Sequence, residues 1–114
     1  MSEIFMNNGI RIEDRIPKSI TVSVRYNEKV YSGITQNISK NGLYIETIGL
    51  PFDRSNDISI ILAGDKALYR LEGEIKWNKK ITSLSVEESL NGLGVKLISV
   101  PADYINFIEY QKHL

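Results

Sequence analysis

The sequence contains no cysteine, and its single histidine, His113, is the next-to-last of 114 residues. The absence of cysteine excludes disulfides, thiolate nucleophiles and cysteine metal sites, and it agrees with a reducing compartment. One terminal histidine leaves no second imidazole for a metal site and no base near any serine in the sequence. We therefore expect neither a resident metal nor an enzymatic activity.

Long apolar runs and an excess of charge of one sign are also lacking. No stretch of 18 or more apolar residues is present, and the N-terminus does not resemble a signal peptide, so we expect a cytoplasmic protein without membrane insertion. Fourteen Lys and Arg balance fourteen Asp and Glu, so the chain has no overall charge that would attract nucleic acid. Any site for an anion must therefore be local.

What the chain has is the composition of one globular domain, with 42% hydrophobic and 25% charged residues. Residues 1–18 are polar, and we expect a mobile arm there, followed by a single domain at 19–114. The glycines are scattered at turns, so no glycine-rich phosphate loop is predicted.

Alternation of apolar and polar residues predicts a series of short β-strands. The clearest is Ser19–Tyr26, where Ile20, Val22 and Val24 share one face with Tyr26. In a later strand, Leu71, Gly73, Ile75 and Trp77 are expected to share one face. The further predicted strands are Lys29–Thr35, Leu43–Ile48, Asp57–Ala63, Leu68–Trp77 and Leu93–Val100.

The connections and the C-terminus complete the predicted architecture. Turns are expected at Asn27-Glu28, at Asn41-Gly42 and at 78–80, whereas 81–90 is predicted only as strand or loop. Apolar residues at near-helical spacing after Pro101 predict a helix at 102–113. Six or so strands and one late helix favour a mainly all-β fold, an antiparallel barrel or sandwich capped by the helix.

Two polar motifs are candidates for an anion site. Arg11 and Arg15 are four residues apart, and each guanidinium offers a planar fork of donors for phosphate or a guanine edge. Asn37, Ser39 and Gly42 lie in a turn of small residues some twenty positions later. Taken alone, the first motif is explained by surface ion pairs and the second by a turn with Gly42 at positive φ. Their joint occurrence favours a binding site.

Together, R-I-E-D-R and N-I-S-K-N-G resemble the signature of the PilZ domain, a bacterial receptor module for cyclic di-GMP. G-E-I-K-W at Gly73–Trp77 and G-L-G-V-K-L at Gly92–Leu97 resemble later strands of the family. The resemblance implies a six-stranded antiparallel β-barrel with one C-terminal helix, and a cyclic di-GMP effector that regulates a partner protein by ordering its arm. The implied ligand-binding residues are Arg11, Arg15, Asn37, Ser39 and Gly42.

In this interpretation the two arginines grip phosphates and guanine acceptors, and Asn37 and Ser39 hydrogen-bond the ligand. Asparagine at 37, where the motif also allows aspartate, implies weaker binding, because a neutral amide replaces a charged acceptor. Ile10 adds no third guanidinium, which favours one ligand per chain over a stacked pair.

The sequence leaves two other functions open. A ligand-independent adaptor of the same fold would use the arginines as surface charge, and a barrel that binds single-stranded nucleic acid is disfavoured by the neutral net charge. Trp77, Tyr44 and Phe107 are interpreted as packing residues, although Trp77 lies on a strand that could border the site.

Overall fold

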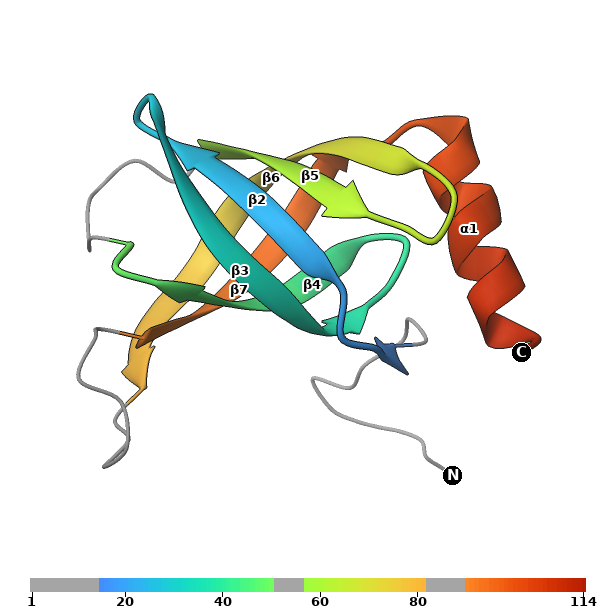
Figure 1. The fold of residues 1–114 in the computed structure, drawn as a ribbon, viewed down its shortest axis with the longest axis horizontal. Coiled ribbons are helices and arrows are strands. Elements are labelled where there is room, and N and C mark those ends of the chain that lie inside the picture. Colours follow the sequence, from blue (N-terminus) through green and yellow to red (C-terminus); the bar gives the residue numbers. More distant parts are fainter. Residues whose placement is uncertain (1–14, 51–56, 82–89) are drawn as a thin grey trace.

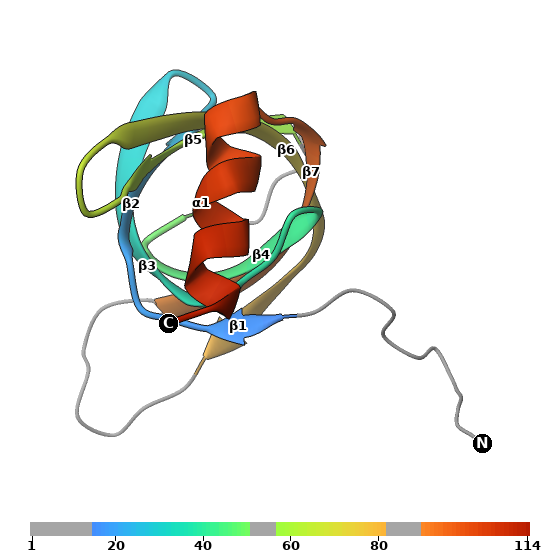
Figure 2. The same cartoon turned by 90° about the vertical axis from the view of Figure 1, so that its right-hand side faces the viewer.

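The computed structural model describes residues 15–50, 57–81 and 90–114. Six strands form a closed antiparallel barrel in the order β3-β2-β5-β6-β7-β4, with β4 pairing back onto β3, and a short extra strand, β1, also pairs with β3. One helix, α1, lies across an open end of the barrel (Figures 1 and 2). The elements are β1 (Ile16–Pro17), β2 (Thr21–Tyr26), β3 (Lys29–Ile38), β4 (Gly42–Ile48), β5 (Asp57–Ala63), β6 (Leu68–Ile81), β7 (Leu90–Ser99) and α1 (Ala102–Lys112).

The barrel interior is the hydrophobic core, and the period of two in the sequence produces it. In β2, Val22, Val24 and Tyr26 are buried while their neighbours are exposed, as the alternation predicts. Helix α1 closes the barrel end with Tyr104 and Phe107, and both rings pack against Tyr69 of β6. The predicted barrel capped by a terminal helix is confirmed.

A buried threonine forms the corner between β1 and β2. The Thr35 hydroxyl donates to the backbone carbonyl of Lys18 at 2.6 Å and accepts from the backbone N–H of Ile20 at 2.8 Å. Ile16 and Pro17 then pair with the end of β3. The N-terminal segment, which we expected to be free through residue 18, is therefore fixed to the barrel from β1 onward, and residues 1–14 lie outside the described part.

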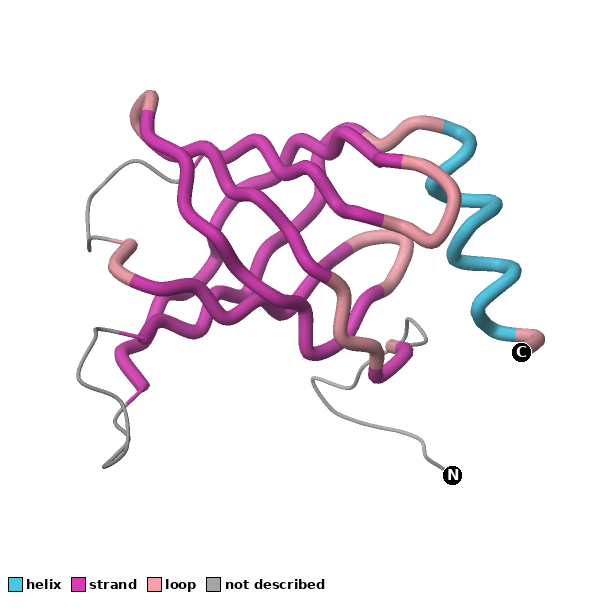
Figure 3. Tube along the Cα trace, viewed as in Figure 1, coloured by secondary structure: helices cyan, strands magenta, loops and turns pink. Residues whose placement is uncertain are grey.

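The predicted turns are confirmed at Asn27-Glu28 and at Asn41-Gly42, and the turn predicted at 78–80 is wrong. Asn27 and Glu28 form a two-residue turn with φ of 49° and 68°. The turn expected at 78–80 does not exist, because these residues continue β6, which runs with β7 well beyond β5 (Figure 3). The last strand was predicted to begin at Leu93 and begins at Leu90, so Asn91 and Gly92 lie within β7. The strand or loop predicted for 81–90 falls mostly outside the described residues.

A β-bulge in β6 makes one prediction wrong, namely that Trp77 shares a strand face with Ile75. Ile75 pairs with Val95 and Trp77 pairs with Gly94, so Lys76 is an extra residue between them. The extra residue shifts the inward and outward alternation by one position. Ile75 is therefore buried, whereas Trp77 is 45% exposed on the outer surface instead of sharing the inner face with it.

Candidate ligand-binding site

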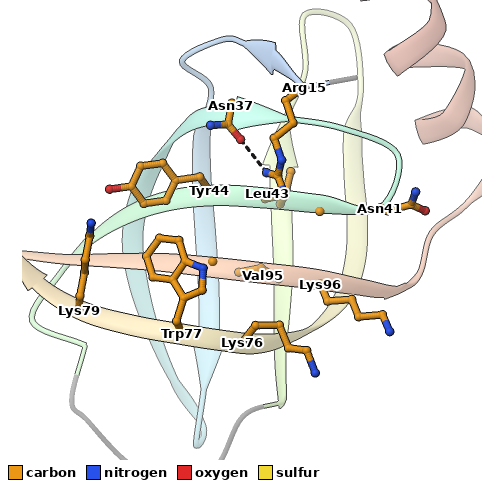
Figure 4. A pocket seen from close by; sticks show the side chains of 12 residues that line it. Arg15, Asn37, Asn41, Leu43, Tyr44, Lys76, Trp77, Lys79, Val95 and Lys96 are labelled. Carbon is orange, nitrogen blue, oxygen red and sulfur yellow. Dashed lines mark hydrogen bonds between the residues drawn. The ribbon is translucent and has the colours of Figure 1, made fainter. Parts of the chain in front are cut away.

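A hollow of about 500 Å³ lies on the outer face of the barrel, over neighbouring strands β3, β4, β7 and β6 (Figure 4). Its floor follows one row of paired residues, in which Asn37 faces Tyr44, Tyr44 faces Gly94, and Gly94 faces Trp77. The lining residues are Arg15, Asn37, Asn41, Gly42, Leu43, Tyr44, Lys76, Trp77, Lys79, Gly94, Val95 and Lys96.

The two sequence motifs meet at this hollow. Arg15 precedes β1 directly, and its Nη1 donates to Asn37 Oδ1 at 2.8 Å across 22 positions of sequence. The pairing of β1 with the end of β3 causes this meeting, because Pro17 lies opposite Asn37. Three predicted site residues, Arg15, Asn37 and Gly42, line the hollow together, whereas Arg11 lies outside the described residues.

Ser39 holds the turn and does not line the hollow. It is completely buried, and its hydroxyl donates to the Gly42 carbonyl at 3.1 Å and accepts from the N–H groups of Asn41 and Gly42. Such side-chain to backbone bonds stabilise tight turns. Among the glycines in the described part of the chain, Gly49 alone has a positive φ, so a left-handed conformation does not explain Gly42.

The aromatic floor of the hollow was missed by the sequence analysis. Trp77 and Tyr44 have ring centroids 5.3 Å apart with planes at 44°. The Trp77 indole lies directly over Gly94, where an added Cβ would be 2.1 Å from Nε1. A half-exposed indole beside cationic groups is a stacking surface for a base. A glycine at 94 inside a strand pattern was the available signal, since it allows a close approach to the backbone, but the bulge that turns Trp77 outward was not visible in the sequence.

The hollow is positively charged although the chain is neutral. Arg15, Lys76, Lys79 and Lys96 line it, and none of the described lining residues carries a carboxylate. Lys79 Nζ lies 5.4 Å from the centroid of the Trp77 ring, within range of a cation–π interaction. The hollow therefore gathers positive charge locally, on a chain whose net charge is zero.

The Tyr44 hydroxyl lies beside the Glu46 carboxylate. Burial raises the pKa of the Tyr44 hydroxyl, and the neighbouring Glu46 carboxylate raises it further. Glu46 Oε1 in turn accepts from Gln36 Nε2 at 3.3 Å. Tyr44 therefore stays neutral around pH 7 and presents a ring and a hydroxyl rather than a negative charge.

The described part of the chain has neither a cluster typical of a metal site nor a helix that could span a membrane. Across residues 15–50, 57–81 and 90–114, no three His, Asp or Glu side chains gather where they could hold a metal ion. Helix α1, as described, is too short to cross a bilayer. The lining offers hydrogen-bond donors, cations and aromatic rings, which is the chemistry of an anionic, base-containing ligand.

Comparison with known proteins gives matches in family and in fold. The sequence matches the PilZ domain family over residues 10–110. The structure is similar to that of the Bacillus subtilis inhibitor of motility (MotI/DgrA), with TM-score 0.68 and 14% identity over 93% of this chain and 51% of that one. It is also similar to the PilZ domain of YcgR from Escherichia coli, solved with c-di-GMP, with TM-score 0.65 and 10% identity over 87% of this chain and 86% of that one.

The comparison with curated proteins gave no match. The chain spans about half the length of the MotI/DgrA chain. The sequence match covers both motifs, the whole barrel and most of α1, and the closed six-stranded topology with a terminal helix agrees with it. The chain therefore belongs to the PilZ domain family.

Proposed function

We propose that this chain is a receptor for cyclic di-GMP that regulates a partner protein by a change of its surface and not by catalysis. The observation that carries the proposal is the meeting of the two motifs, in which Arg15 and Asn37 join across 22 positions at the edge of a cationic, aromatic hollow. The YcgR domain of similar fold was solved with c-di-GMP. That ligand has two phosphates and two guanines, which match the cations and rings that line the hollow.

In this proposal the described motif residues have roles that agree with where they lie, and Arg11 has the role that the motif implies. Arg15, together with Arg11 four residues earlier in the sequence, grips phosphate oxygens and the O6 and N7 acceptors of guanine. Asn37 hydrogen-bonds the base edge. Ser39 contributes by holding the turn in shape, since its hydroxyl is buried in that turn, and Gly42 leaves its strand open to the ligand.

Trp77 is added to this set as a stacking surface for one guanine. Its ring is 45% exposed and is held between Tyr44, Lys79 and the backbone at Gly94. A ring that is already fixed loses little conformational entropy when a base stacks on it. Base stacking on an aromatic side chain contributes about 1–3 kcal/mol.

Ligand binding would exchange one hydrogen bond for others. Without ligand, Asn37 Oδ1 accepts a hydrogen bond from Arg15. A guanine that binds here must replace this bond with hydrogen bonds to the Asn37 amide, to the Arg15 guanidinium or to both. Contacts made only in the bound state supply the free energy that orders the N-terminal arm. The arm with its ligand then forms a new surface for a partner in the cytoplasm.

Isothermal titration of cyclic di-GMP into the purified chain tests the proposal, with GMP as competitor. We expect saturable binding of one ligand per chain, lost in Arg15→Ala and retained in Arg25→Ala, which removes an exposed arginine from β2 outside the hollow. Absence of heat and of a thermal shift at high micromolar ligand would refute the receptor and favour a ligand-independent adaptor.

A further inference from the structure

The wall of the hollow opposite Arg15 is formed by two lysines that neither motif contains. Lys76 of β6 and Lys96 of β7 extend in the same direction from neighbouring strands, away from the aromatic floor (Figure 4). Both side chains are exposed. The hollow therefore has cations on two separate sides, with Arg15 on one and the lysine wall, Lys76 and Lys96, on the other.

The strand geometry places this wall at the site. The bulge at Lys76 puts that residue and Trp77 consecutively on the outer surface. Lys96 lies opposite Gly42, the last residue of the second motif, in the pairing of β4 with β7. A lysine across the strand pair from the motif can reach a ligand that contacts the motif.

The two lysines differ in how much of their charge is neutralised. Lys76 Nζ donates to Glu74 Oε1 at 3.0 Å, and Glu74 is the residue paired with Lys96 on the adjacent strand. Among the described residues, Lys96 makes no ion pair. Two ammonium groups and one carboxylate leave one net positive charge on the lysine wall, and Lys96 presents it.

We propose that Lys96 determines ligand specificity by binding a second anionic group of the ligand, at the side of the hollow away from Arg15. The inference rests on the proposed function and adds that tight binding requires a ligand with two phosphates. A ligand with two phosphates contacts both Arg15 and Lys96, whereas a mononucleotide bound at Arg15 does not reach Lys96. The specificity is the resulting difference in affinity between the dinucleotide and the mononucleotide.

Opposite changes of charge on the lysine wall test the proposal. Lys96→Gln should weaken cyclic di-GMP binding about three- to tenfold and leave GMP binding unchanged, so the preference for the dinucleotide falls by the same factor. Glu74→Gln should tighten binding about two- to threefold, because it removes the carboxylate beside both lysines. Titration calorimetry at two salt concentrations supplies the dissociation constants.

Lys66→Gln is the matched control, since it makes the same charge change in the turn between β5 and β6, outside the hollow, and should not alter binding. If Lys96→Gln changes the affinity for cyclic di-GMP less than twofold while Arg15→Ala abolishes binding, the role proposed for Lys96 is refuted and the receptor function stands. Equal losses for GMP and cyclic di-GMP would also refute it. If the wild-type chain binds no cyclic di-GMP, both proposals fall.

Discussion

At the scale of single residues, the site depends on Gly94 as much as on the residues that carry charge. The missing side chain at Gly94 is what allows the Trp77 indole to lie against β7. The nearest atoms to an added Cβ all belong to the indole and none to the backbone. A methyl group at this position would displace the ring and leave the barrel intact.

Gly94→Ala is therefore expected to weaken ligand binding tenfold or more while the protein remains folded, because stacking on the displaced ring is lost. Trp77 is the only tryptophan of the chain, so its fluorescence reports the movement directly. We expect a red shift of the emission maximum as the indole becomes more hydrated.

Gly49→Ala is the contrasting variant. Gly49 has φ of 76° and no atom within 4 Å of an added Cβ, so alanine there should cost about 1 kcal/mol of stability through backbone strain alone. Its tryptophan emission should match that of the wild type. A Gly94→Ala protein with unchanged emission and affinity would disprove the role assigned to the indole.

At the scale of elements, helix α1 is attached to the turn of the second motif. The Tyr104 hydroxyl donates to the Ser39 carbonyl at 2.7 Å, and both residues are completely buried. Lys40, the next residue of the turn, forms an ion pair with Glu109, which also pairs with Lys112 at 3.5 Å. The turn that borders the hollow is thus held on one side by the helix.

Tyr104→Phe should lower the free energy of unfolding by about 1–2 kcal/mol, because the Ser39 carbonyl loses a buried donor. Urea denaturation measures the change. Tyr110→Phe is the matched control on the same helix, and since that side chain is 63% exposed we expect almost no effect. Equal stabilities of the two variants would show that the buried bond does not hold the helix.

The ion pairs of Glu109 predict a dependence of stability on pH. The hydrogen bond from Lys40 is the largest cause of the lowered pKa of Glu109, burial opposes it, and the charges of Lys112 and Lys40 lower the pKa further. A carboxyl group whose pKa is lowered by folding stabilises the protein above its unfolded pKa, and this stabilisation disappears as the pH falls through the folded pKa.

Glu109→Gln should therefore reduce stability slightly at pH 7, and the difference from wild type should shrink as the pH falls below the ordinary glutamate pKa. Denaturant midpoints of both proteins between pH 7 and pH 3 measure this difference. A gap that is constant over the series, or that widens in acid, would contradict the role assigned to the ion pair.

At the scale of the whole molecule, the barrel carries its site on the outer surface, separate from its core. Arg15 and Trp77 are exposed, whereas the core consists of inward residues of the strands and of α1. Loss of the ligand should therefore leave the fold intact, and binding should add stability by mass action.

A ligand concentration one hundred times the dissociation constant should stabilise the folded chain by about 2.7 kcal/mol, a rise in Tm of roughly 10 °C. Differential scanning calorimetry across a series of ligand concentrations measures it. The ligand-free Arg15→Ala protein should melt within a degree or two of wild type and show no rise. A steep loss of Tm in ligand-free Arg15→Ala would mean that this side chain supports the fold.

Much of the architecture was predictable because strand periodicity is a local property. The alternation in Ser19–Tyr26 predicted the buried face of β2, and the apolar spacing after Pro101 predicted α1 to within a residue or so at either end. Asn41-Gly42 correctly marked the connection between β3 and β4, whereas Asn91-Gly92 lies inside β7. The same dipeptide had two outcomes because its neighbours in the sheet differ.

The sequence by itself determined the family, the barrel with its terminal helix, and the two motifs, since these follow from residue types and their spacing along the chain. Only the tertiary structure decided that Ser39 is buried in the turn and that Trp77 and Lys96 face the hollow. Burial of a hydroxyl depends on what packs over it. The direction of Trp77 depends on a bulge defined by the pairing of β6 with β7, and the place of Lys96 depends on the register of β7 with β4, so neither is a property of one strand alone.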